Sequence, residues 1–264
     1  MKSLEGKSIV IIGGTTGLGF SAAKACIEAG ARVMAVGRNS ESARQAGEMF
    51  GEHGHVMTGD ACDSSTAELA IKTAIERFGK FDGLYHVAGG SGRKMGDGPL
   101  HEITDEGWAA TINLNLTSLV YSNRAAVKAF LSHGTGGSIL NMGSVLGSSP
   151  SPRYFATHAY AATKAGAEGF SKSVAAYYAP QNIRVNVLAP ALVETPMARR
   201  AAEDSEIMEF IAGKQPLDGG RIGRPEDLDG AVIYFLSDAS AFVTGQVLYV
   251  DGGWCLSDRA FPND

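Results

Sequence analysis

A tyrosine and a lysine four positions apart are the first residues in this chain whose types and spacing could do chemistry. Tyr160 and Lys164 lie in HAYAATKAGAEGF, residues 158–170, where the abundance of alanine favours a helix. Residues four apart share a helix face, so the ammonium would lie beside the phenol. Positive charge favours the phenolate of a tyrosine, which otherwise titrates at about 10. An ordinary solvated pair has the same spacing, so the rest of the chain must decide.

A glycine-rich loop follows the first apolar run directly. The stretch GGTTGLG runs from Gly13 to Gly19 and opens into an expected helix near Phe20. Gly13 would allow a tight turn, Gly17 would let the backbone approach a pyrophosphate, and Gly19 would permit close packing of helix on strand. Amides at the helix start would face the phosphates. Three glycines at this junction favour a dinucleotide site over a merely flexible turn.

The end of the second apolar run bears on the choice of cofactor. Its sequence, AVGRNSES, has Gly37 and Arg38 where an enzyme that prefers NAD often carries an acid for the ribose 2′-hydroxyl. A guanidinium can bind a phosphate with two hydrogen bonds, and removing the acid removes repulsion. NADP(H) is therefore the favoured cofactor, NAD(H) remains possible, and an exposed arginine without a ligand is the alternative. Asp60 in TGDACD is placed to meet the adenine, with Ala61 beside it.

Short β-rich runs alternate with amphipathic ones along the chain, which is typical of βαβ units. The predicted strands are SIVIIG, ARVMAVG, HVMTG, DGLYHVAG, GSILNMG, IRVNVLAP and QVLYVDGG. The predicted helices are Phe20–Ala29, Ser40–Phe50, Thr66–Phe78, Asp105–Leu131, Ala159–Tyr178 and Pro225–Leu236, with Ser40 and either Thr104 or Asp105 as caps. The strand runs are mostly continuous apolar stretches, as expected when helices cover both faces of a parallel sheet. The sequence therefore predicts an α/β fold, a Rossmann-type doubly wound parallel sheet of about seven strands.

The totals indicate one domain with small-molecule partners. A chain of 264 residues, 44% hydrophobic with 34 glycines, can bury one large core, so we expect a single domain over 1–264. Two long excursions, Gly89–His101 and Ala191–Gly220, follow predicted strands at the edge where open α/β sheets bind ligands, and we expect a substrate lid around 191–220. The net charge of -5, without a basic run, argues against nucleic acid and anionic membrane surfaces.

The cysteines and the lengths of the apolar segments indicate the cellular compartment and whether a metal site is expected. The three cysteines, Cys26, Cys62 and Cys255, are scattered, so we expect neither a disulfide framework nor a metal site. No segment approaches transmembrane length, and the apolar stretch Ile9–Ile12 is shorter than a signal-peptide core. The sequence predicts a cytoplasmic protein.

Motifs spread over nearly the whole chain resemble those of the short-chain dehydrogenase/reductases in their single-domain classical form. In the family's order they are IIGGTTGLG, HVAG, INLNL, NMGS, YAATK, NVLAPALVETPM and TGQVLYVDGG. The resemblance implies hydride transfer between a nicotinamide cofactor and a small ketone, aldehyde or alcohol. It also implies a homo-oligomer, usually a tetramer and otherwise a dimer, with the helices around Asp105–Leu131 and Ala159–Tyr178 at a dimer interface.

The resemblance assigns roles to single positions. Tyr160 matches the catalytic acid/base, and Lys164 matches the lysine that lowers the pKa of that tyrosine and binds the nicotinamide ribose. Ser144 in NMGS matches the hydroxyl that holds the substrate carbonyl. Asn115 in INLNL matches the asparagine that supports a water relay behind the lysine, with Asn113 as the competing candidate.

The same resemblance gives the expected cofactor contacts. They are Gly13, Thr15, Thr16, Gly17, Leu18, Gly19, Arg38, Asp60, Ala61, Ala88, Gly89, Tyr160, Lys164, Pro190, Val193 and Thr195. Asn186 is expected at the end of the strand that leads to the nicotinamide and pyrophosphate contacts.

The chain departs from the family pattern near the expected substrate site. His86 and Val87 replace two asparagines, Gly143 replaces a serine, and the segment from Ser144 to Tyr160 is longer than usual, which suggests a reshaped substrate pocket. We interpret His86 as a satisfied interior histidine, and Tyr154 as a pocket or surface residue without a lysine partner. Candidate substrate contacts are the segments Gly90–Gly98, with Arg93 and Lys94, and Met197–Gly213, with Arg199, Arg200, Ile207, Met208 and Phe210. The charge of the substrate stays open.

Three functions fit these residues. The leading hypothesis is an NADP(H)-dependent carbonyl reductase or alcohol dehydrogenase with Tyr160 as acid/base. A non-catalytic dinucleotide-binding sensor or scaffold is the second, and an isomerase or dehydratase on the same fold is the third.

Overall fold

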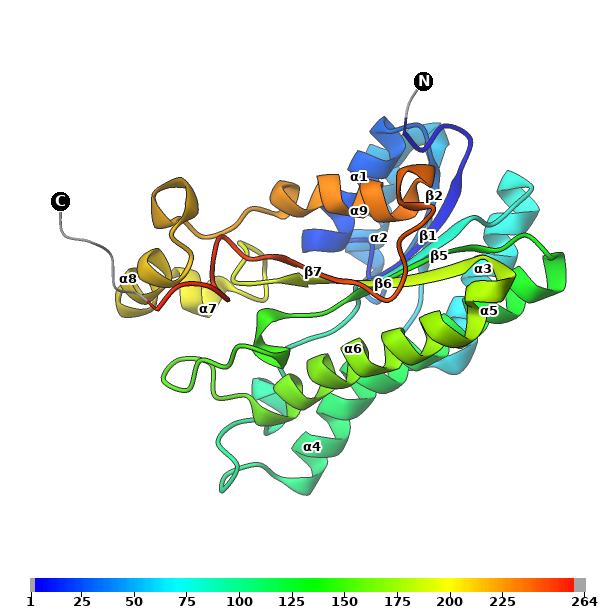
Figure 1. Cartoon of the computed structure of the whole chain (residues 1–264). Coiled ribbons are helices and arrows are strands. Elements are labelled where there is room, and N and C mark those ends of the chain that lie inside the picture. Colours follow the sequence, from blue (N-terminus) through cyan, green and yellow to red (C-terminus); the bar gives the residue numbers. More distant parts are fainter. Residues whose placement is uncertain (1–2, 259–264) are drawn as a thin grey trace.

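One parallel sheet runs through the molecule (Figure 1). The computed structural model describes residues 3–258, so the ends of the predicted 1–264 domain, residues 1–2 and 259–264, lie outside the described residues. Its seven strands are ordered β3-β2-β1-β4-β5-β6-β7 and all neighbours pair in parallel. They are β1 Ser8–Ile12, β2 Arg32–Gly37, β3 Gly54–Thr58, β4 Gly83–His86, β5 Gly137–Met142, β6 Ile183–Pro190 and β7 Val247–Val250. The predicted fold and all seven strand runs are confirmed.

Helices cover both faces of this sheet (Figure 1). On one face lie α1 Gly17–Glu28, α2 Ser40–Phe50 and α9 Asp229–Leu236; on the other lie α3 Ser64–Phe78, α5 Ser118–His133 and α6 His158–Tyr178. The helix α4 Asp105–Ile112 continues through the π-helical segment η3 Asn113–Thr117 into α5, and α7 Arg199–Ala202 and α8 Ser205–Lys214 follow β6. The short 3₁₀ segments are η1 Gly51–His53, η2 Arg93–Met95, η4 Val145–Gly147, η5 Ala179–Gln181, η6 Leu217–Gly220, η7 Pro225–Leu228 and η8 Asp238–Ser240.

Burial on both faces explains why the strand sequences are continuously apolar. Along β1, Ile9 and Ile11 pack into the core under α1 and α9, while Val10 and Ile12 pack into the core under α3 and α5. Successive side chains of a strand point to opposite faces, so a strand covered on both sides is mostly apolar along its whole length. The two cores therefore fix the sheet from both sides.

The helix starts show where sequence interpretation was right and where it was wrong. Thr104 caps α4 as predicted, because its Oγ1 accepts from the Gly107 amide at 2.9 Å. The predicted cap Ser40 is wrong by one residue, since Asn39 accepts from the Ser42 amide at 2.8 Å and Ser40 is already helical. Asparagine and serine are both favourable cap residues and stand next to each other here, so the sequence alone could not show which of them caps the helix.

The strand order changes direction between β1 and the central strand, β4. The connections that leave the carboxyl ends of these two strands run to opposite sides, which opens a crevice there. Within residues 3–258, no helix combines the length and the apolar composition that a membrane crossing requires.

Candidate active site

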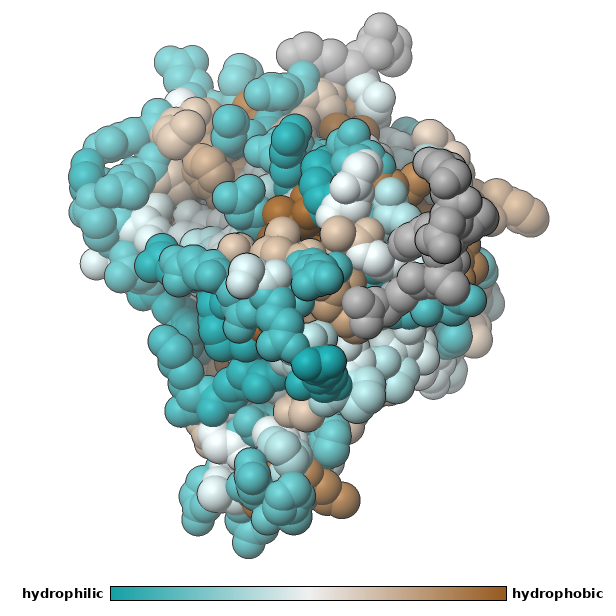
Figure 2. All heavy atoms as spheres, turned by 90° about the vertical axis from the view of Figure 1, so that its left-hand side faces the viewer, coloured by the Kyte–Doolittle hydropathy of each residue, from teal (hydrophilic) through white to brown (hydrophobic). Residues whose placement is uncertain are grey.

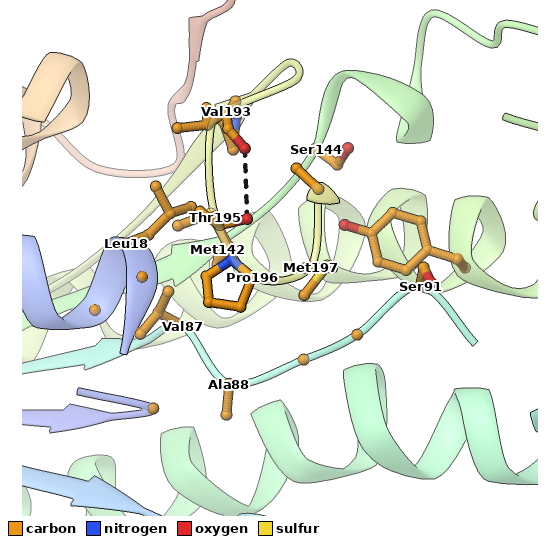
Figure 3. Close-up of a pocket in the computed structure, with 18 of the residues that line it drawn as sticks. Leu18, Val87, Ala88, Ser91, Met142, Ser144, Val193, Thr195, Pro196 and Met197 are labelled. Atoms are coloured by element: carbon orange, nitrogen blue, oxygen red, sulfur yellow. Dashed lines mark hydrogen bonds between the residues drawn. The ribbon is translucent and has the colours of Figure 1, made fainter. Parts of the chain in front are cut away.

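A cavity of about 480 Å³ lies along the carboxyl ends of the strands. Figure 3 shows part of its wall, to which α1 contributes Leu18 and the segment after β4 contributes Val87 to Ser91. The segment after β6 contributes Val193, Thr195, Pro196 and Met197. Every predicted catalytic and cofactor residue lines this cavity except Asn115. The fold thus brings the predicted site together, while the roles of its residues stay predictions.

The glycine loop is shaped by close backbone approach. Gly13 has a φ of +95°, and a Cβ added there would lie 2.7 Å from the amide nitrogen of Ala88. A Cβ at Gly19 would lie 2.1 Å from the carbonyl oxygen of Gly13, which is closer than any non-bonded contact allows. Within the described chain no side chain caps the start of α1, so its first amides are left for a ligand at the cavity.

The end of β2 excludes an acidic side chain. A Cβ added at Gly37 would lie 1.9 Å from Oγ1 of Thr15, so any residue larger than glycine would displace the glycine loop. Arg38 is exposed, lines the cavity, and forms no ion pair with a carboxylate of residues 3–258. Asp60 fixes the loop after β3, because its Oδ1 accepts from the Cys62 amide at 2.9 Å. This corner of the cavity is therefore suited to an anionic group on the ligand.

Tyr160, Lys164 and Ser144 meet where α6 passes the end of β5. Lys164 is buried, and its Nζ donates to the carbonyl oxygen of Met142, the last residue of β5, at 2.8 Å. The same Nζ lies 5.4 Å from the centre of the Tyr160 ring. Ser144 is buried just beyond β5, where its Oγ accepts from the Leu146 amide at 3.2 Å.

Burial governs the protonation of this group. It lowers the pKa of Lys164 to about 8. It also raises the pKa of Tyr160, while hydrogen bonding with Ser144 acts in the opposite direction. Desolvation of the phenolate sets the net direction of this shift, and the role of Lys164 in lowering the pKa of Tyr160 stays a prediction.

Asn115 lies beneath the cavity and holds one wall in place. It is buried in η3, where Nδ2 donates to the carbonyl oxygens of Gly90 and Thr111 at 2.9 and 3.0 Å, and Oδ1 accepts from the Gly90 amide at 2.9 Å. A Cβ built at Gly89 would lie 2.7 Å from Asn115 Oδ1 and 3.7 Å from Lys164 Nζ, so both side chains approach the same point. The competing candidate Asn113 is exposed. π-helical turns are frequent at functional sites, and this one turns Asn115 inward.

The start of α6 is capped by a residue that sequence reasoning missed. Asp97 is buried, and its carboxylate oxygens accept from the amides of Ala159 and Tyr160 at 3.0 and 2.9 Å. Thr157 occupies the cap position, yet in the described structure its side chain makes no cap hydrogen bond. A carboxylate at a helix N-terminus satisfies free amides and complements the helix dipole. Because Asp97 lies far from α6 in sequence, no local signal could have revealed it.

The remaining wall is made by side chains from four segments. Of the predicted substrate contacts, Arg93, Lys94, Met197 and Arg200 line the cavity, whereas Arg199, Ile207, Met208 and Phe210 do not. The structure adds residues that the sequence did not single out: Leu146, Phe155, Thr157, Leu192 and Trp254. Phe155 and Phe210 each pack against the Trp254 ring with centroids 5.9 Å apart. These three aromatic rings meet only because α8 and the chain after β7 pack against the segment that contains Phe155.

Three side chains near the site have structural partners. His86 is buried with Nδ1 2.9 Å from Ser122 Oγ, and burial lowers its pKa to about 3, which confirms the interpretation of a satisfied interior histidine. Tyr154 does not line the cavity, and its hydroxyl donates to Glu206 at 2.9 Å. Asn186 lies within β6 and does not line the cavity; its side-chain amide donates to the Val243 carbonyl oxygen and accepts from the Gln246 amide.

Comparison with known proteins places this geometry among enzymes of one type. The family model described as enoyl-(acyl carrier protein) reductase matches residues 13–255. The chain is 34% identical over 254 residues to the 3-oxoacyl-[acyl-carrier-protein] reductase FabG of Chlamydia trachomatis, covering 95% of this chain and 98% of that one. It is 33% identical over 249 residues to the cis-4-hydroxycyclohexanecarboxylate dehydrogenase of Sinomonas cyclohexanicum, covering 93% and 95%. A short-chain type dehydrogenase/reductase structure from Mycobacterium ulcerans superposes with a TM-score of 0.88 at 30% identity, covering 97% and 92%.

Proposed function

Because the chain belongs to the short-chain dehydrogenase/reductase family, we propose that it is an NADP(H)-dependent oxidoreductase with Tyr160 as acid/base. Family members act on CH–OH and C=O groups with NAD(P)(H). The reaction interconverts a ketone or aldehyde and an alcohol by hydride transfer. The observation that carries the proposal is that Tyr160, Lys164 and Ser144 share one cavity with the glycine loop.

The proton chemistry follows from the positions of these side chains. The glycine loop and Lys164 would hold a nicotinamide cofactor, which would supply or accept the hydride. The Ser144 hydroxyl donates to the substrate oxygen, and Tyr160 donates its proton to the same oxygen as negative charge develops there. Burial raises the pKa of Tyr160, which favours the protonated phenol that donates in the reducing direction. Oxidation requires the phenolate, so its rate rises as the pH increases.

The preference for NADP(H) over NAD(H) is supported by the corner beside β2. Gly37 leaves no room for the acid that would bind a 2′-hydroxyl, and the neighbouring Arg38 offers an unpaired guanidinium within the described structure. A guanidinium binds phosphate with paired hydrogen bonds. Asn115 acts behind Lys164 by holding Gly90.

A parallel titration with NADPH and NADH, followed by nicotinamide fluorescence, tests the proposal. Wild-type protein is expected to bind NADPH more tightly than NADH, and Arg38→Ala to weaken NADPH binding by about ten- to a hundredfold with little effect on NADH. Arg44→Ala is the matched control, since Arg44 lies on α2 and pairs with Glu41 and Glu48. Equal affinities for both cofactors in the wild type would refute the assignment of Arg38.

The proposal extends to the whole chain. Residues 1–264 would act as one catalytic domain, with a lid around 191–220 that positions Met197 and Arg200 at the cavity. A homo-oligomer, usually a tetramer and otherwise a dimer, is the proposed assembly, and apolar side chains exposed on α4, α5 and α6 support an interface there: Trp108, Leu131 and Tyr177. A small molecule is the proposed substrate. The named relatives act on a carrier-protein-bound 3-oxoacyl group in one case and on a hydroxycyclohexanecarboxylate in the other, so relatedness does not choose between them.

A further inference from the structure

We propose that Arg93 and Arg200 form an anion-binding subsite for the substrate, whose reacting carbonyl or alcohol is carried on an apolar body bearing a carboxylate. This inference rests on the proposed function, because it names the substrate class of the same cavity. Both residues line the cavity that holds Tyr160 and Ser144. They come from different elements, η2 and α7.

The two guanidinium groups converge on one point. Nη2 of Arg93 donates to the carbonyl oxygen of Tyr154 at 2.9 Å, and Nη2 of Arg200 donates to the same oxygen at 3.4 Å. Burial and the charge of Arg200 both lower the pKa of Arg93. Two like charges held together at the edge of a cavity repel each other, and a bound anion would relieve that repulsion.

No carboxylate of residues 3–258 pairs with either arginine. Asp97 opposes the effect of Arg200 on the pKa of Arg93, but both of its oxygens accept from the first amides of α6. Glu206 pairs with Arg153 and accepts from Tyr154. Asp60 is the one acid that lines the cavity in the described chain, and it follows β3 on the adenine side. The wall around Arg93 and Arg200 is therefore positively charged.

Arg93 is presented by a segment that is fastened at both ends. Asn115 holds the backbone of Gly90, and Asp97 is joined to α6. Between them, Gly92 and Gly96 take φ values of +74° and +101°, and a Cβ at Gly92 would lie 2.4 Å from Thr111 Oγ1. A guanidinium has several N–H donors in a planar fork, and Tyr154 occupies only part of it. The rest can bind an oxyanion with paired hydrogen bonds at little cost in ordering.

The apolar part of the cavity wall indicates that the body of the substrate is apolar. Leu146, Phe155, Leu192, Met197 and Trp254 line the same cavity. The end of the molecule that carries α7 and α8 faces the viewer in Figure 2, where hydrophilic residues surround a smaller hydrophobic area. A hydrocarbon body with a charged end fits such a wall better than a sugar or a polyol does. An oxo acid or hydroxy acid has this combination, and a phosphate ester shares the same recognition chemistry.

Matched probes test the subsite without requiring turnover. Benzoate, benzamide and phenyl phosphate share one apolar body and differ in charge. Their dissociation constants would be measured by isothermal titration calorimetry on the full chain, with and without saturating NADPH. The variants are Arg93→Gln and Arg200→Gln. Arg199→Gln is the control, because Arg199 adjoins Arg200 on α7, is exposed, and does not line the cavity.

Benzoate is expected to bind at least about tenfold more tightly than benzamide, because hydrogen bonds to charged groups are the stronger ones. Each of the two variants should abolish most of this preference, and Arg199→Gln should keep it. Tighter binding of phenyl phosphate than of benzoate would assign the subsite to phosphate esters, and the reverse order would assign it to carboxylates.

Three results would overturn the subsite. They are equal binding of benzoate and benzamide, no benzoate binding at about 10 mM, and an equal loss of preference in Arg199→Gln. The titration in the absence of NADPH separates this inference from the proposed function. A benzoate preference that depends on Arg93 and Arg200 in a protein that binds no nicotinamide cofactor would refute the proposed function and leave the anion subsite standing.

Discussion

The cofactor wall and the substrate wall of the cavity are built in opposite ways. The cofactor wall consists of strand ends and glycines, and its shape depends on positions such as Gly13, Gly19 and Gly37 where a side chain would collide. The substrate wall consists of side chains such as Phe155 and Trp254, brought together from distant segments. The shape of the cofactor wall depends on positions that have no side chain, whereas the shape of the substrate wall depends on the side chains that are present. Backbone positions therefore shape most of the wall proposed for the cofactor, with the Arg38 side chain as an exception, while side chains shape the wall proposed for the substrate.

Tyr160 belongs to both walls, so its replacement should have the largest effect on activity. In Tyr160→Phe the substrate oxygen loses its proton donor, and kcat is expected to fall by about a thousandfold while NADPH affinity stays within about threefold. Stopped-flow measurement of nicotinamide oxidation would report the hydride-transfer rate. Tyr154→Phe is the control, because Tyr154 does not line the cavity. A Tyr160→Phe enzyme with the full rate would remove Tyr160 from the mechanism.

Gly19→Ala should damage the cofactor wall alone. Its Cβ would lie 2.1 Å from the Gly13 carbonyl oxygen, so the loop must shift. We expect NADPH affinity to fall by about a hundredfold and the free energy of unfolding to fall by about 2 kcal/mol. Gly169→Ala, also in a helix, meets nothing within 4 Å in the described structure, so it should leave NADPH affinity unchanged and raise the free energy of unfolding by up to about 1 kcal/mol. Fluorescence titration and urea unfolding would measure them, and equal behaviour of the two variants would contradict the steric account.

The contrast between the walls explains what the sequence could predict. Strands buried on both faces produce continuous apolar runs in the sequence, and the glycine loop is a local sequence pattern. The fold and the cofactor corner could therefore be predicted from the sequence. The substrate wall could be predicted only in part. Arg199 and Arg200 are neighbours of identical type, and packing of a short helix decides which one faces the cavity. Trp254 carries no local signal, because its partners Phe155 and Phe210 are far away in sequence.

Asp97 connects the two walls, since it lies in the segment of Arg93 and caps the helix of Tyr160. Asp97→Ala should lower the free energy of unfolding by about 1 to 2 kcal/mol, because two helix amides lose their acceptor. It should also lower kcat with little change in NADPH affinity. Asp97→Asn keeps one acceptor oxygen and should restore part of both losses. Steady-state kinetics and urea unfolding would show this, and an unchanged kcat in Asp97→Ala would limit Asp97 to a purely structural role.

Replacing Asp229, which contacts α1 behind the cofactor wall, should give the smallest effect, a small change in the free energy of unfolding. It accepts from Ser21 of α1 at 2.8 Å, and burial raises its pKa to about 6. A carboxyl whose pKa is higher in the folded than in the unfolded protein contributes stability below its unfolded pKa near 4, and this contribution is lost as the pH rises through about 6. Asp229→Asn should therefore gain about 1 kcal/mol over wild type near pH 7.5, with little gain near pH 4. Urea unfolding at both pH values would test the sign, and a gain confined to the lower pH would contradict it.

The central claim is that this cavity transfers a hydride between a nicotinamide and a carbonyl carbon. The most direct measurement uses NADPH that carries deuterium at both hydrogen positions of nicotinamide C4, and follows the label by mass spectrometry into the products of a panel of ketones and aldehydes, with and without a carboxylate. The account predicts one deuterium on the new carbinol carbon for each cofactor oxidised, in wild type and at a strongly reduced rate in Tyr160→Phe. Product formed without label while the cofactor is unchanged would indicate an isomerase or dehydratase, and tight cofactor binding without transfer to any substrate would indicate a sensor or scaffold; either result would contradict the account.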